Sequence, residues 1–237
     1  MKKLTKRLKT VQALFDKSKA YGLKEAIAIL KKATKVKFDE TVEVAAKLNV
    51  DPKQSQTASI RGTVALPHGT GRKVRVVVFC KGEEEKRAKD AGADFVGAED
   101  LAAKIQGGWV DFDVAIATPD MMKDIAKLGK VLGPRGLMPN PKSGTVTQDT
   151  AKTIKEVKAG KIEFKMDKQA GVHAPVGKLS FTEDSLYANA LSLIDALMAA
   201  NSQGAVGPRG QHVKTLFIST TMGPGVRLDL SEFKEKA

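Results

Sequence analysis

The spacing of hydrophobic residues at the start of the chain predicts two helices followed by two strands. Apolar residues recur at helical intervals over residues 4–19 and again over 23–33, with Gly22 between them. Over residues 38–48 apolar and polar positions alternate, which is the period of a strand with one buried face. A further strand is expected over residues 60–66. This pattern predicts helices packed against a one-sided sheet.

After residue 67 the pattern changes to continuous apolar runs that alternate with amphipathic segments. Residues 74–80 form such a run, which is typical of a strand buried on both faces. The elements predicted next are a helix over 82–90, a strand over 93–97, a helix over 100–107, a strand over 110–118, a helix from Pro119 and a helix over 148–159 ending at Gly160. Strands and helices that alternate in this way indicate a parallel sheet covered on both faces.

The last part of the chain returns to alternation. Strands are expected over 162–166, more weakly over 171–176, and over 213–219, with a long helix over 183–201. Each outer segment is too small for a core of its own, so we expect the two to share one sheet.

The predicted fold class is therefore α/β (α+β) with two domains. A discontinuous split α+β sandwich domain comprises residues 1–67 and 160–237, and an inserted Rossmann-like parallel α/β domain comprises 68–159. The two chain crossings between them are a candidate hinge.

The positive charge is concentrated at the start of the chain. Of the net charge of +13, +10 falls in residues 1–37, which hold 12 Lys or Arg against two acids. The other 200 residues carry 28 basic and 25 acidic groups, a net of +3. A local basic patch favours a polyanion, because neutralised phosphates release their counterions. No apolar run approaches the ~20 residues of a membrane span, and no signal peptide is expected.

Residue types that mark enzyme and metal sites do not occur here in suitable patterns. His68, His173 and His212 are far apart and have no partner at metal-ligand spacing. Cys80 lies in an apolar run and is interpreted as a buried hydrophobe. The sequence His68-Gly-Thr-Gly leads into a strand, whereas a phosphate loop leads into a helix, so a linker is the preferred interpretation. We therefore predict no enzyme activity, no cofactor and no metal.

Two segments rich in glycine and proline are candidate contact loops. Residues 133–145 contain three Pro and three Gly, which suits a rigid surface loop and a pre-ordered contact loop equally well. Residues 220–225, Thr-Thr-Met-Gly-Pro-Gly, follow a strand and form a turn. The hydroxyls of Thr220 and Thr221 could bond to ribose 2′-hydroxyls, while Met222 packs on a base or sugar and Gly223 allows close approach.

Other candidates for contact with RNA lie near the predicted strands. Phe38, beside Lys37, is either a second apolar contact or a core residue of its strand. Lys165, Lys168 and Lys178 add charge around the later strands, where most such runs are only solvated.

Several long motifs together resemble one known family. They are Lys37-Phe-Asp-Glu-Thr-Val-Glu-Val, Arg61-Gly-Thr-Val-Ala-Leu-Pro-His-Gly-Thr-Gly, Leu132-Gly-Pro-Arg-Gly-Leu-Met-Pro-Asn-Pro-Lys, Ile162-Glu-Phe, His173-Ala-Pro-Val-Gly-Lys and Thr221-Met-Gly-Pro. In this order they resemble the ribosomal protein L-one family, the bacterial large-subunit proteins of the tRNA-exit stalk. The resemblance covers nearly the whole chain, and the family has one domain inserted into another.

The resemblance implies a structural protein that binds large-subunit rRNA and forms the mobile stalk that helps release deacylated tRNA at the exit site. It also implies repression of the protein's own operon mRNA, a cytoplasmic location in the large ribosomal subunit, a free protein that is monomeric, and no membrane partner. With the residue-level candidates, the expected RNA-binding set is Lys37, Phe38, Thr41, Lys165, Lys168, His173, Lys178, Thr220, Thr221, Met222 and Gly223, with Arg135 and Lys142 as secondary contacts.

Two other classes of function remain open from the residues alone. An enzyme for a phosphorylated small molecule would use the inserted domain and show a deep pocket with perturbed titratable groups at its strand ends. A membrane-surface protein would bind anionic lipid through the basic first helix.

Overall fold

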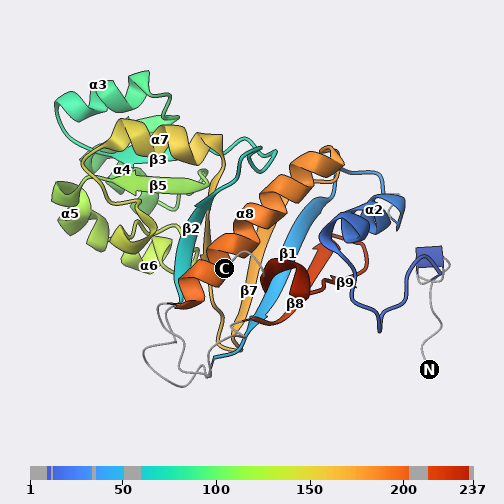
Figure 1. The fold of residues 1–237 in the computed structure, drawn as a ribbon. Helices are drawn as coiled ribbons and strands as arrows, with labels where there is room; N and C mark the ends of the chain where they lie inside the picture. The colour runs from blue at the N-terminus through green and yellow to red at the C-terminus, as the bar shows by residue number, and fades with distance from the viewer. Residues whose placement is uncertain (1–9, 12, 34–35, 51–59, 203–212, 235–237) are drawn as a thin grey trace. The chain divides into compact units, whose positions relative to one another are not determined.

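A computed structural model describes residues 10–11, 13–33, 36–50, 60–202 and 213–234. The chain divides into two compact units, one of Met1–Gly71 with Ile162–Ala237 and one of Arg72–Lys161 (Figure 1). We call them the discontinuous unit and the inserted unit. The sequence predicted the corresponding limits at residues 67/68 and 159/160.

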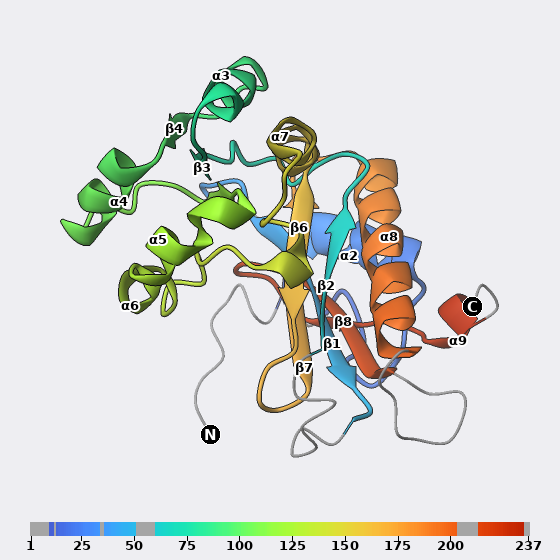
Figure 2. The ribbon, with the colours of Figure 1, turned by 90° about the vertical axis from the view of Figure 1, so that its left-hand side faces the viewer.

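The discontinuous unit is built on a four-stranded antiparallel sheet in the order β7-β1-β8-β9. The strands are β1 (Thr41–Leu48), β7 (Gly171–Lys178), β8 (Val213–Thr220) and β9 (Val226–Arg227). Alternate residues of β1, from Val42 to Leu48, are buried. Helices α2 (Leu23–Ala33) and α8 (Glu183–Ser202) cover that face (Figures 1 and 2), and among the described residues of this unit no helix packs on the other face.

Three smaller elements complete this unit. Strands β2 (Arg61–Ala65) and β6 (Lys161–Lys165) form a two-stranded sheet, and α8 packs against β2. Phe164 of β6 is buried in the same core as α2 and α8. The short helix α9 (Ser231–Lys234) follows β9, and Glu232 accepts the backbone N–H of Leu23 at 2.9 Å, which caps the first turn of α2.

The inserted unit is a three-stranded parallel sheet in the order β4-β3-β5. Its strands are β3 (Val76–Phe79), β4 (Phe95–Gly97) and β5 (Val114–Ala117). Its helical elements are α3 (Glu83–Asp90), α4 (Glu99–Gln106), η1 (Pro119–Met121), α5 (Met122–Ala126), α6 (Gly129–Leu132), η2 (Pro141–Ser143) and α7 (Thr150–Ala159).

Strand β3 is buried on both faces, as its continuous apolar sequence predicts. Val76 and Val78 pack in one cluster with α3 and α7, whereas Val77 and Phe79 pack in a second with α4, α5 and α6. The alternation of side chains along a strand therefore divides one apolar run between two cores. Helices consequently lie on both sides of this sheet (Figure 1).

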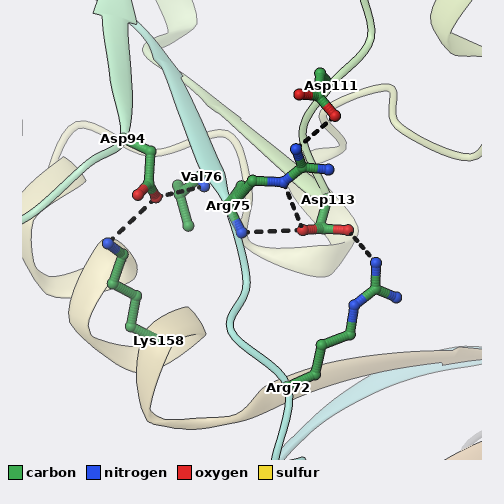
Figure 3. A network of polar contacts seen from close by, with 7 residues as sticks. All are labelled: Arg72, Arg75, Val76, Asp94, Asp111, Asp113 and Lys158. Atoms are coloured by element: carbon green, nitrogen blue, oxygen red, sulfur yellow. Dashed lines mark hydrogen bonds and ion pairs between the residues drawn. The ribbon is translucent and has the colours of Figure 1, made fainter.

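Ionic contacts fix the beginning of the inserted unit (Figure 3). The Asp113 carboxylate accepts the Arg75 N–H at 3.0 Å and the Arg72 guanidinium at 2.6 Å. Arg75 also pairs with Asp111, and this hydrogen bond is the main reason that the pKa of Arg75 is raised. From Arg72 onward the chain is therefore held to the segment that leads into β5.

A second carboxylate, Asp94, holds the first residue of β3 from the other side (Figure 3). It accepts the Val76 N–H at 2.9 Å and lies 3.2 Å from the Lys158 ammonium. Burial alone would raise the pKa of Asp94, but these two donors outweigh it and lower the pKa.

Most predicted elements are present, and the differences have local causes. The helix expected over residues 4–19 does not reach Lys19, since residues 13–15 form a turn and bend. Asp16 instead accepts hydrogen bonds from the backbone and hydroxyl of Ser18, which is an Asx turn that competes with helix. The part over residues 4–9, with much of the basic patch, lies outside the described residues.

Other differences concern strand and helix length. The helix expected from Pro119 is broken into η1, α5 and α6, and the weak strand over 171–176 is a full partner of β1. The register of β1 and β7 shifts between Val42 and Glu43, so Val176 has no partner in β1. Strand β9 and helix α9 were not predicted.

Candidate nucleic-acid interface

Three segments meet at one end of the four-stranded sheet. They are residues 38–41, which lead into β1, residues 178–180 at the end of β7, and residues 220–223 at the end of β8. Antiparallel pairing creates this arrangement, since Thr41 is opposite Lys178 and Val42 is opposite Thr220. Residues about 180 positions apart in the chain therefore become neighbours.

Two threonine hydroxyls lie at the centre of this end. Thr221 Oγ1 accepts the Thr41 N–H at 3.0 Å and is 3.4 Å from the Thr41 carbonyl, which also accepts the Thr221 N–H at 3.0 Å. Thr41 Oγ1 accepts a hydrogen bond from Lys178 Nζ at 2.9 Å. The hydroxyl of Thr41 is thus left with its own proton to donate, and that of Thr221 with a lone pair.

Two large apolar side chains are exposed close in sequence to these hydroxyls, Phe38 three residues before Thr41 and Met222 directly after Thr221. Phe38 is 54% exposed and Met222 is 55% exposed, so the alternative that Phe38 belongs to the core is wrong. Gly223 follows in a turn closed by its N–H to the Thr220 carbonyl at 3.1 Å. Large exposed apolar residues grouped with polar ones are typical of a binding surface.

Thr220 differs from its expected position at the surface. Its side chain is buried, and its hydroxyl is 3.4 Å from the carboxylate of Glu40. Because β8 alternates, Thr221 is exposed and Thr220 faces inward. The alternation in residues 213–219 was the signal that could have shown this.

Acidic residues that the sequence reasoning missed hold the three segments together. Asp39 accepts both the backbone N–H of Ser180 at 3.1 Å and its hydroxyl at 2.7 Å. Glu40, fully buried, accepts the Met222 N–H at 2.8 Å. Nothing in the local sequence distinguishes these two acids from solvated ones, because their partners are distant in the chain.

The open face of the sheet extends away from this end. His173 is exposed and lies in a row of cross-strand neighbours with Ala45, Phe217 and Arg227. Side chains opposite one another on neighbouring strands share a face, so this row belongs to the uncovered side. The sequence analysis did not include Phe217 or Arg227. The alternation of buried and exposed positions along their strands could have indicated that both lie on the same face as His173.

The lysines are spread along the unit rather than gathered at one point. Lys178 contacts Thr41 at one end of β7. Lys165 is the exposed last residue of β6, and Lys168 is exposed in the turn that leads into the other end of β7. The eight residues of β7 span about 24 Å. The turn that carries Lys168 is held by Asp167, whose pKa is lowered mainly by the Gly171 and Gln169 N–H groups. Lys37 is exposed next to Phe38.

The loop expected to make a secondary contact belongs to the inserted unit. Arg135 is exposed within it, and Lys142 lies in η2. Asn140 N–H donates to Thr145 Oγ1 at 2.8 Å, and Ser143 Oγ donates to the Asn140 carbonyl at 3.1 Å. This part of the loop is therefore ordered by its own hydrogen bonds.

The inserted unit shows no sign of a reactive group at its strand ends. Cys80 follows β3, and burial, reinforced by Glu85 and Glu84, raises its pKa to about 11, so the thiol is protonated at neutral pH. Across the described ranges, no cluster of three or more His, Cys, Asp or Glu could hold a metal ion. None of the helices in those ranges could cross a membrane.

Exposed apolar and hydroxyl groups at the end of a sheet, with lysines along the same unit, are features expected of a surface that binds RNA. The sequence profile of the Ribosomal protein L1p/L10e family matches residues 30–224. The large ribosomal subunit protein uL1 of Protochlamydia amoebophila (strain UWE25) is 51% identical over 228 residues, which cover 96% of this chain and 95% of that protein. The chain belongs to the Ribosomal protein L1p/L10e family. The resemblance is thus confirmed, and with it the expectation of a ribosomal protein that is not an enzyme.

Proposed function

We propose that this protein is a cytoplasmic constituent of the large ribosomal subunit that binds large-subunit rRNA through the end of its four-stranded sheet. The observation that carries this proposal is the group formed by Phe38, Met222 and the Thr41–Thr221 pair. It offers apolar area for a base or sugar together with hydroxyl groups for the backbone.

The two hydroxyls suit RNA better than DNA. A ribose 2′-hydroxyl both donates and accepts hydrogen bonds. Thr41 retains a proton to donate after accepting from Lys178, and Thr221 retains a lone pair. The pair is therefore complementary to a 2′-hydroxyl, which DNA lacks.

The remaining charged residues would position the RNA backbone. His173 and the row of residues beside it provide the open face, and Lys37, Lys165, Lys168 and Lys178 surround it. Such contacts set the register and add affinity, while the apolar and hydroxyl groups recognise shape. Arg135 and Lys142 would make a secondary contact from the inserted unit.

The finer roles implied by the family resemblance are part of this proposal. We expect the protein to form the mobile stalk that contacts deacylated tRNA at the exit site, and to repress its own operon mRNA. An mRNA that imitates the rRNA would occupy the same surface, so the two RNAs should compete for it. The free protein is expected to be monomeric.

The experiment is a titration of the protein with large-subunit rRNA, scrambled RNA, DNA of matching sequence and anionic liposomes at near-physiological salt. Wild-type protein should prefer rRNA. Met222→Asp should lower the rRNA affinity by about a hundredfold, since it replaces an apolar contact with a charge that repels phosphate. Met222→Leu is the matched control and should retain binding. The proposal fails if Met222→Asp binds normally, or if DNA competes as well as RNA.

The salt dependence of binding tests the lysines separately. Lys168→Ala should reduce the slope of log affinity against log salt by about one. Lys89→Ala, an exposed lysine of α3, is the control and should leave the slope unchanged. An unchanged slope for Lys168→Ala would show that Lys168 does not contact phosphate.

A further inference from the structure

Glu40 is the one acidic residue in the described ranges that is buried, and it lies beneath the turn that presents Met222. Its Oε1 atom accepts the Met222 N–H at 2.8 Å, and its Oε2 atom is 3.4 Å from the Thr220 hydroxyl. None of the ion pairs found among the described residues includes it.

The charge of Glu40 has the wrong sign for an RNA contact. A carboxylate repels phosphate, and an acid without solvent or an ionic partner is costly to keep in a core. What stabilises it here is a charge-assisted hydrogen bond from the backbone of the turn, which is stronger than a bond between neutral groups. This geometry indicates a role in holding the protein's own backbone.

The segment that carries Glu40 is itself fixed on both sides. Its carbonyl accepts the N–H of Leu179 at 2.8 Å, and the next residue, Thr41, donates its N–H to Thr221 at 3.0 Å. The carboxylate therefore has a defined direction. Its two oxygens contact the first and third residues of the Thr220–Met222 segment. The backbone of Met222 is therefore fixed by a buried carboxylate while its side chain is exposed.

We infer that Glu40 is a positioning residue for RNA recognition: it fixes the Thr220–Gly223 turn so that Thr221 and Met222 are pre-organised on the surface. This inference rests on the proposed function. A pre-organised turn binds more tightly because its ordering cost is met on folding rather than on binding.

The first test uses the unaltered protein. Met222 has an exposed side chain, yet its amide should exchange with solvent at least about tenfold more slowly than in an unstructured peptide, because it donates to a buried carboxylate. Hydrogen exchange followed by NMR measures this. Exchange at the unstructured rate would overturn the inference without any variant.

Two variants then separate positioning from charge. Glu40→Gln keeps an oxygen for the Met222 N–H, and the rotatable Thr220 hydroxyl can accept from the new amide, so rRNA affinity should stay within about threefold. Glu40→Leu removes both acceptors and should weaken binding by about tenfold to a hundredfold. Because Glu40 does not touch phosphate, the salt slope should be the same in all three proteins.

The outcomes distinguish this inference from the function on which it rests. If Met222→Asp abolishes binding but Glu40→Leu binds rRNA like the wild type, the inference about Glu40 is wrong and the interface stands. If Glu40→Gln is as weak as Glu40→Leu, the charge matters rather than the acceptor, and positioning is refuted. If Met222→Asp binds normally, the interface itself is misplaced. Should Glu40→Leu fail to fold, the exchange measurement and Glu40→Gln decide.

Discussion

Asn189 offers a quantitative test of how the discontinuous unit is held together. It is fully buried in α8, and its side-chain amide donates to the carbonyls of Val176 at 2.7 Å and Gly69 at 2.9 Å. Its oxygen accepts the N–H of His68 at 3.0 Å. One side chain therefore connects the segment before the inserted unit to strand β7.

The cost of Asn189→Ala follows from these partners. Val176 has no register partner in β1 because of the shift, so we count its buried carbonyl as unsatisfied once the Asn189 donor is removed. The bonds to His68 and Gly69 are partly buried, and water can replace them. The unsatisfied Val176 carbonyl is counted at its full cost, and the bonds to His68 and Gly69 are counted at a fraction of theirs. The free energy of unfolding should then fall by about 2–4 kcal/mol. For a unit of this size the melting temperature should fall by roughly 5–15 °C.

The assay uses the position of the single tryptophan. Trp109 lies in the inserted unit, so its fluorescence follows that unit, while far-UV circular dichroism follows both. In a urea titration, Asn189→Ala should shift the dichroism transition and leave the Trp109 midpoint unchanged. Ser192→Ala is the matched control on the same helix: its hydroxyl only bonds back to the Ala188 carbonyl at 3.0 Å, so stability should change by less than about 0.5 kcal/mol.

Two results would refute this reasoning in different ways. A loss of stability below about 0.5 kcal/mol would show that Asn189 does not satisfy groups that need it. An equal shift of the Trp109 transition would show that the two units unfold together rather than separately.

Three further predictions concern stability. Gly62→Ala should destabilise the protein by about 1–3 kcal/mol, because an added Cβ would lie 2.6 Å from the buried ring of Phe164; Gly129→Ala, with open space, should not destabilise it in the same denaturation assay. Cys80 should react with a thiol reagent far more slowly in native than in unfolded protein. Its pKa is raised from 9.0 to about 11, so the folded state binds the proton more tightly, and stability should fall as pH rises from about 9 through about 11 in urea titrations. Glu232→Ala should cost about 1 kcal/mol through loss of the α2 cap, and an unchanged urea midpoint would contradict that role.

The elements with strong local patterns were predictable. Helix α2 has the predicted bounds, Leu23–Ala33, because its apolar face and flanking Gly22 are local features. The sharp end of α7 at Gly160 follows from the left-handed conformation there, with φ of 113°, which glycine adopts readily. The short strand β9 has only two residues and no pattern of its own, so only pairing with β8 defines it.

The candidate site was predictable in part. The residue types in Thr221–Gly223 and at Phe38 predicted a contact surface, and the structure shows Phe38, Thr221 and Met222 as exposed. The inward side of Thr220, the bond from Asp39 to Ser180 and the place of Glu40 were not predictable, because the partners lie 141 to 182 residues away. Lys168 lies at the opposite end of β7 from Thr41, and this separation depends on strand pairing, so the positions of the lysines in the sequence could not show it.

The sequence by itself determined the local period of each main element, the change from α+β to α/β patterning and back along the chain, and the family resemblance, since these depend on nearby residues and on recognisable motifs. Only the tertiary structure decided which residues lie together at the candidate interface. Antiparallel pairing of β1 with β7 and β8 brings together residues from both ends of the chain. Within this group Glu40 is buried and holds the turn, whereas Thr221 and Met222 in the turn are exposed. Register and burial are properties of the assembled sheet, so no local sequence pattern predicts them.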